Sequence, residues 1–156
     1  MQMKNSPIQL ASWETEVVAS KLISQAARAL ARLSDARLKG LGLAIGQLPV
    51  FVALKEGAQL SQKELARIAG VEQPSMAQLL ARMERDGLIH REPDPADGRS
   101  SLISLSESAT ALLAPAREIL FQGNREALAG FEQAEIDQLI SLLGRVIANV
   151  ASGDGA

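Results

Sequence analysis

Apolar residues recur at steps of three and four along most of the chain. Stripes of this kind cover residues 10–33, 106–128 and 132–151. Such spacing places apolar side chains on one face of a helix. The pattern therefore predicts a mainly helical protein with long helices near both ends, in residues 10–39 and 106–151.

Shorter segments lie between these long helices. A glycine-rich stretch ends the first helix, and Pro49 suits the opening turn of a second helix that stops at Gly57. Ser61 and Glu64 have the spacing of a capping box, in which each side chain accepts from the backbone N–H of the other residue. A third, short helix is therefore expected between Ser61 and Gly70.

The next helix is expected from about Gln73 to Arg85, after which the period of the pattern changes. Residues 88–92 and 101–105 have the pattern of short strands, and the segment 93–98 between them is rich in turn-forming Pro, Asp and Gly. The sequence thus predicts a β-hairpin directly after a pair of helices.

Residues 64–89 meet the steric demands of a helix-turn-helix. Ala66 is small where the two helices cross, Gly70 permits the positive φ of a tight turn, and Met76 lies on the face that packs inward. A hairpin beside such a unit can serve as a wing. We predict a winged helix-turn-helix unit in residues 44–105, within a single domain that spans the whole chain.

The composition of the chain excludes several classes of functional site. The chain has no cysteine, which excludes disulfides, thiolate metal ligands and a cysteine nucleophile. The single histidine, His90, offers no metal site without partners. No serine has a convincing base partner, and no glycine-rich loop has phosphate-binding spacing. We therefore expect no catalytic residues, no metal, no cofactor and no enzymatic activity.

The first twenty residues contain Glu14 and Glu16 and no apolar run long enough for a signal peptide or a membrane span. We expect a soluble cytoplasmic protein that does not interact with membranes.

Charge is unevenly distributed. The net charge is −2, so the chain as a whole lacks the basic character that favours non-specific nucleic-acid binding. Residues 61–99 contain six Lys or Arg and seven Asp or Glu, a net charge of −1. Residues 21–39 are basic, because Asp35 is their one acidic residue and the cations are Lys21, Arg28, Arg32, Arg37 and Lys39.

The sequence resembles the multiple-antibiotic-resistance regulator (MarR) family of bacterial transcription factors. The resemblance rests on the helix-turn-helix segment 64–89, on GLIHR at 87–91, on DPADGR at 94–99 and on LISLS at 102–106. It implies a homodimer that binds a pseudo-palindromic site on double-stranded DNA. It also implies a regulator, more often a repressor, that a small aromatic or phenolic anion releases from DNA.

By this resemblance, the helix from about Gln73 to Arg85 enters the major groove, and Asp97 holds Arg99 toward the minor groove. A narrow minor groove concentrates negative potential and attracts an inserted arginine. Glutamine can pair with the edge of adenine, while a helix N-terminus and arginines suit phosphates. The predicted DNA contacts are Ser61, Gln62, Gln73, Pro74, Ser75, Gln78, Arg82, Asp97 and Arg99.

The chain departs from the family in its charges. The family commonly has a basic residue where this chain has Gly98, and often where it has Gln73 and Gln78. Fewer cations then neutralise phosphates, which predicts a modest dependence of affinity on salt. The near-neutral unit leaves open an alternative, a winged-helix protein-interaction module that has lost DNA binding. A third possibility is a helical ligand-binding dimer without a regulatory role.

The terminal helices and one basic segment suggest further partners. The apolar stripes of residues 10–33, 106–128 and 132–151 need a partner surface, which a second copy or packing within one chain can supply. An anionic effector is expected near Trp13, Arg37, Lys39, Gln47 and Phe51, where cations adjoin apolar side chains. The alternative for the cations is a solvated helix end that complements the helix dipole.

Overall fold

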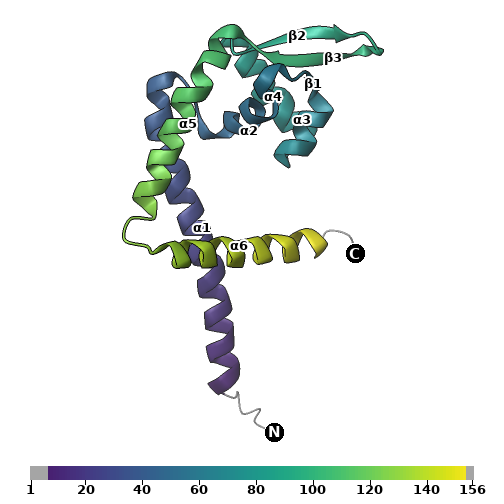
Figure 1. Ribbon diagram of the computed structural model, residues 1–156. Helices are drawn as coiled ribbons and strands as arrows, with labels where there is room; N and C mark the ends of the chain where they lie inside the picture. Colours follow the sequence, from purple (N-terminus) through teal and green to yellow (C-terminus); the bar gives the residue numbers. More distant parts are fainter. Residues whose placement is uncertain (1–6, 154–156) are drawn as a thin grey trace.

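The computed structural model describes the backbone of residues 7–153 and the side chains of residues 18–153. The helices and strands succeed one another as shown in Figure 1, with three short 3-10 turns between them: α1 (Pro7–Leu38), η1 (Lys39–Leu41), η2 (Ile45–Gln47), α2 (Leu48–Ala53), η3 (Lys55–Gly57), β1 (Leu60–Ser61), α3 (Gln62–Ala69), α4 (Gln73–Arg85), β2 (Ile89–Asp94), β3 (Asp97–Leu105), α5 (Glu107–Ala127) and α6 (Gln133–Gly153).

The elements form two parts. Helices α2, α3 and α4 and the small sheet make a compact head, and α1 and α5 pack side by side into a stem below it (Figure 1). Helix α6 turns away from the end of α5 and runs beneath the head (Figure 1). The predicted fold class, mainly helical with a small β-hairpin and a winged helix-turn-helix flanked by long helices, is confirmed.

The head has one apolar core. Its fully buried side chains come from the end of α1, from the three helices of the head with Leu54, and from β2 and β3: Leu38, Val50, Phe51, Leu54, Leu65, Met76, Leu80, Met83, Ile89 and Ile103. Ala109 and Ala116 of α5 close the core on the side of the stem. Because these residues lie at helical or strand spacing, the sequence pattern and the core coincide.

The sheet is larger than the sequence predicts. Its strands lie in the order β1-β3-β2 and all pair antiparallel, with Leu60 opposite Ile103 and Ile89 opposite Leu105. The prediction omitted β1, because a two-residue strand has no alternating pattern to detect. The hairpin is also longer than predicted, and its turn narrows to residues 95–96.

Two helix boundaries differ from the expected ones. Helix α1 begins earlier than residue 10 and continues to Leu38. Helix α2 ends at Ala53 rather than near Gly57, and Glu56 then takes a left-handed backbone conformation with φ 61°. Pro115 lies inside α5, which nevertheless runs as one helix.

Among the described residues, no single helix is both long and apolar enough to cross a membrane. By length and composition alone, the bent pair of segments 18–41 and 45–57, with 86° between them, would suffice.

Candidate nucleic-acid interface

Helices α3 and α4 form the predicted helix-turn-helix. Gly70 ends α3 with φ 64°, and the N–H of Val71 donates to the carbonyl of Ala66 over 3.1 Å. Ala66 of α3 is buried where the two helices meet, and Met76 of α4 is fully buried in the same core. The small residue, the turn glycine and the apolar face therefore have the places that the sequence predicts.

Helix α4 presents one polar face to solvent. Met76, Leu80 and Met83 are buried, and the helical period puts the opposite face outward. All five predicted α4 contacts are exposed: Gln73, Pro74, Ser75, Gln78 and Arg82. Arg85 shares this face, which sequence reasoning missed although its spacing from Gln78 and Arg82 (i, i+4, i+7) would have revealed it.

The beginning of α3 has the predicted capping box. The N–H of Glu64 donates to Ser61 Oγ over 3.3 Å, and the N–H of Ser61 donates to Glu64 Oε2 over 2.8 Å. Bonds from the Ser61 backbone N–H and then from its hydroxyl lower the pKa of Glu64. A carboxylate therefore already occupies this helix end, where the sequence suggested a phosphate.

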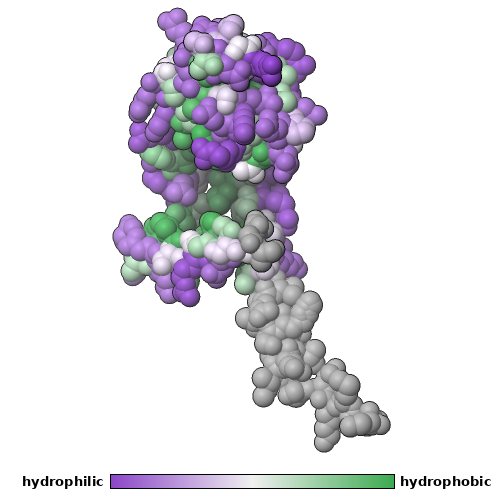
Figure 2. All heavy atoms as spheres, turned by 90° about the vertical axis from the view of Figure 1, so that its right-hand side faces the viewer, coloured by the Kyte–Doolittle hydropathy of each residue, from purple (hydrophilic) through white to green (hydrophobic). Residues whose placement is uncertain are grey.

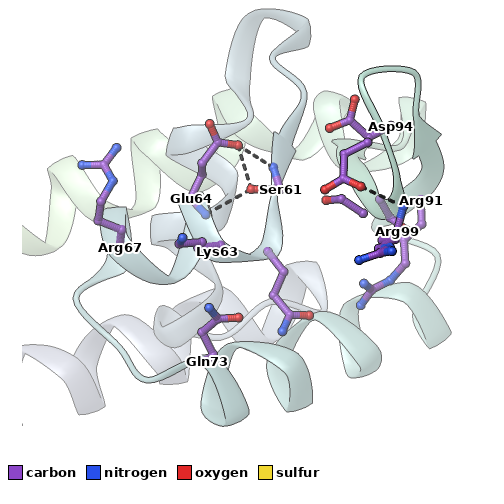
Figure 3. A pocket seen from close by; sticks show the side chains of 12 residues that line it. Ser61, Lys63, Glu64, Arg67, Gln73, Arg91, Asp94 and Arg99 are labelled. Atoms are coloured by element: carbon purple, nitrogen blue, oxygen red, sulfur yellow. Dashed lines mark hydrogen bonds between the residues drawn. The ribbon is translucent and has the colours of Figure 1, made fainter.

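A polar cleft separates the beginning of α3 from the hairpin, with Gln73 of α4 at its lower edge (Figure 3). Its volume is about 900 Å³, and it is lined by Ser61, Gln62, Lys63, Glu64, Arg67, Gln73, Arg91, Asp94, Asp97, Arg99, Ser100 and Ser101. Five of the predicted DNA contacts meet here, while Pro74, Ser75, Gln78 and Arg82 lie outside the cleft lining. The cations Lys63 and Arg91 were not predicted as contacts.

The tip of the hairpin is shaped by two aspartates. Asp94 Oδ1 accepts from the N–H of Ala96 over 2.8 Å, and Asp97 Oδ1 accepts from the backbone N–H of Arg99 over 3.0 Å. Asp97 thus holds the backbone of Arg99 and leaves its exposed guanidinium without a salt bridge among the described residues. The wing presents a cation at the mouth of the cleft (Figure 3).

The residues predicted for an effector have varied surroundings. Phe51 lies in the core at 1% exposure, and Gln47 is buried, with its Oε1 accepting from the N–H of Ala44 over 2.9 Å. Arg37 forms a salt bridge with Glu126 of α5, and Lys39 is exposed. The side chain of Trp13 lies outside the described residues. Gln47 and Phe51 therefore serve local capping and core packing.

A second cavity of about 300 Å³ lies between α1 and α5. Its lining is mostly apolar: Leu30, Leu33, Ser34, Leu120, Phe121, Gly123 and Asn124. Arg37 adjoins it, because a Cβ at Gly123 would lie 3.8 Å from Arg37 Nη1. That nitrogen is buried and has no hydrogen-bond partner.

A helix-turn-helix followed at once by a hairpin with a cationic tip defines a winged helix-turn-helix protein. Comparison with known families places it more narrowly, since residues 39–100 match the model of the MarR family. The chain belongs to the MarR family of transcriptional regulators.

Solved structures agree with this assignment. A probable transcriptional regulator from Pseudomonas aeruginosa is 32% identical, with a TM-score of 0.73 over 80% of this chain and 93% of the other. A putative MarR-family regulator from Listeria monocytogenes, complexed with 26mer DNA, is 28% identical, with a TM-score of 0.74 over 85% and 89%. A MarR variant from E. coli, complexed with operator DNA, shares the fold at 22% identity and a TM-score of 0.78 over 86% and 96%.

Proposed function

We propose that this protein is a homodimeric, cytoplasmic, sequence-specific DNA-binding repressor. The observation that carries the proposal is the joint presentation of the polar α4 face and the wing cation Arg99 on one head. Residues 44–105 form the DNA-binding unit, and α1, α5 and α6 supply dimerisation. The Listeria relative, whose structure contains DNA, supports the same use of this fold.

Sequence reading is assigned to α4. Gln73, Ser75 and Gln78 face the edges of bases in the major groove, and Arg82 binds a phosphate. Arg99 enters the adjacent minor groove, where a narrow A·T-rich segment attracts a cation. Gln62, the first residue of α3 after the Ser61 cap, remains available for a backbone contact.

Helix α6 supports the homodimer. Every residue of α6 except the half-buried Ile136 is exposed within its own chain. Ile140, Ile147 and Val150 are each at least 65% exposed. The apolar side of α6 faces a hollow beneath the head (Figure 2). A helix with such a band is stable in water only when the band is covered. A second copy covers it and brings two heads to a two-fold symmetric site.

We propose repression because occupation of DNA is the simplest action open to such a dimer. The described elements supply a reading head and dimerisation helices, so such a dimer acts by occupying DNA. A promoter that is covered by two heads is inaccessible to polymerase.

Relief by a small anion is assigned to the cavity between α1 and α5. Its apolar walls suit an aromatic ring, and the adjacent Arg37 suits a carboxylate. Benzoate at millimolar concentration is the probe: it should release DNA from wild type and release less from Arg37→Lys. Unchanged DNA affinity in benzoate would contradict this assignment.

DNA binding is tested by titrating the protein against the DNA upstream of its own gene and against a random duplex. Wild type should prefer the upstream DNA, and Arg99→Ala should weaken that binding about tenfold, the loss of one good contact. Arg125→Ala removes the same charge from an exposed site on α5 and should bind as wild type does. Equal affinity of wild type for both duplexes would favour a protein-interaction module instead.

A further inference from the structure

One salt bridge joins the recognition helix to the wing. Arg91 Nε, from β2, donates to Glu84 Oε2, from the last turn of α4, over 3.0 Å. The other two salt bridges of the described residues join α1 to α5 and two residues within α5. The Glu84–Arg91 pair is therefore the ionic contact that ties together the two elements proposed to enter the DNA grooves.

Glu84 lies on the same flank of α4 as Gln73, which lines the cleft. Gln73, Ala77 and Glu84 follow one flank of the helix (i, i+4, i+11), and Gln73 lines the cleft together with Arg91. Arg91 and Arg99 both line this cleft (Figure 3). Without its partner, Glu84 would be a free anion on the flank of a helix that approaches DNA.

The Glu84–Arg91 pair also lies where the hairpin leaves the buried part of the head. Ile89, at the beginning of β2, is buried at 2% exposure, and Arg91 is half-buried. Beyond Arg91, residues 92–99 are exposed apart from half-buried Asp94. A planar guanidinium bound to a carboxylate has a defined geometry, so this contact restricts how the exposed hairpin leaves the head.

We propose that Glu84 and Arg91 form a latch that sets the direction of the wing relative to α4, which makes both of them positioning residues for DNA reading. The proposal rests on the proposed function for its DNA readout. An exposed ion pair adds little to stability, so the effect of the latch lies in geometry. The latch keeps Arg99 at the distance from α4 that lets both grooves be read together.

The direction in which Glu84→Gln changes DNA affinity separates this positioning role from simple repulsion of phosphates by the Glu84 charge. If Glu84 only repelled phosphates, its neutralisation would strengthen binding to upstream and random DNA alike. The latch predicts about fivefold weaker binding to upstream DNA with no loss on random DNA. Arg91→Lys, which keeps the charge and loses the planar group, should behave in the same way. Glu92→Gln, an exposed carboxylate of the same strand, is the control and should lose no upstream affinity.

A second measurement needs no DNA. The chain has no cysteine, and a side chain at Gly98 meets nothing within 4 Å, so Gly98→Cys accepts a single dye on the wing. Time-resolved anisotropy should show greater local motion of the dye in Glu84→Gln and Arg91→Lys than in the parent or in Glu92→Gln. Unchanged wing motion would overturn the latch, as would stronger upstream binding by Glu84→Gln. Failure of wild type to prefer upstream DNA would instead refute the proposed function, and the anisotropy measurement would still test the latch.

Discussion

Arg37 and Glu126 join the last turn of α1 to the last turn of α5 by a salt bridge. Arg37 directly precedes Leu38, which belongs to the buried core of the head, so the pair lies where α1 enters the head. The hydrogen bond between the two side chains raises the pKa of Arg37 and lowers the pKa of Glu126. The bond therefore stabilises the charged form of both groups, and the stem becomes sensitive to acid at this point.

Glu126→Gln should lower stability at neutral pH. Because the folded pKa of Glu126 lies below its unfolded value, its contribution is present above the unfolded pKa and disappears as the pH falls through the folded pKa. The difference in urea midpoint between wild type and variant should thus be largest near pH 7 and should shrink below about pH 4.3, the usual pKa of glutamate. Protein concentration must be held constant, because the stability of the proposed dimer would depend on it.

Glu118→Gln is the matched control for this experiment. Glu118 pairs with Arg125 within α5, and both side chains are more than 60% exposed. Such a pair contributes little. An equal change in midpoint for both variants, or a difference for Glu126→Gln that persists at pH 3, would contradict the account.

Ser61→Ala should destabilise the head by about 1 kcal/mol, the usual contribution of an N-cap side chain. The substitution removes the oxygen that accepts from the N–H of Glu64. Urea unfolding of wild type, Ser61→Ala and Ser61→Thr measures the change, and threonine should restore most of the loss because it caps similarly. Wild-type stability in the alanine variant would show that the cap is dispensable.

Glu56→Gly should stabilise the protein by up to about 1 kcal/mol, since a left-handed conformation strains an L-residue and costs glycine nothing sterically. Glu56 is the one described non-glycine residue with positive φ. Lys55→Gly, one position earlier and without positive φ, should instead destabilise by about 0.5 kcal/mol. A lower thermal midpoint for Glu56→Gly than for wild type would refute the strain.

Ile147→Asp should dissociate the proposed dimer, because it places a charge in the exposed apolar band of α6. Sedimentation velocity should show a smaller species together with a lower unfolding temperature. Asn149→Asp adds the same charge on the polar side of α6 and should leave the dimer intact. Identical sedimentation of both variants with wild type would mean that the band does not form the interface.

Local signals in the sequence predicted most of the head. The capping box of Ser61 and Glu64, the turn at Gly70 and the buried face of α4 each depend on neighbouring residues, and all have the predicted structure. Strand β1 escaped prediction because its two residues form a strand only by pairing with β3, more than forty positions later. Its existence is a tertiary effect.

The candidate site was predicted less completely, for the same physical reason. Exposed α4 residues follow from helical period, whereas the cleft depends on how the hairpin folds back toward α3. Lys63 and Arg91 therefore went unnoticed as members of one site. The sequence places Phe51 and Gln47 near cations, but it does not show that both side chains are buried in the head.

Hydroxyl-radical footprinting on the upstream DNA tests the central claim most directly. A dimer whose two heads each place α4 in a major groove and Arg99 in a minor groove should protect two symmetric blocks, with centres about one helical turn, 10–10.5 base pairs, apart. Arg99→Ala should lose the outer, minor-groove protection of each block and retain the central part. A single unsymmetric block, or the same footprint in wild type and Arg99→Ala, would contradict the account.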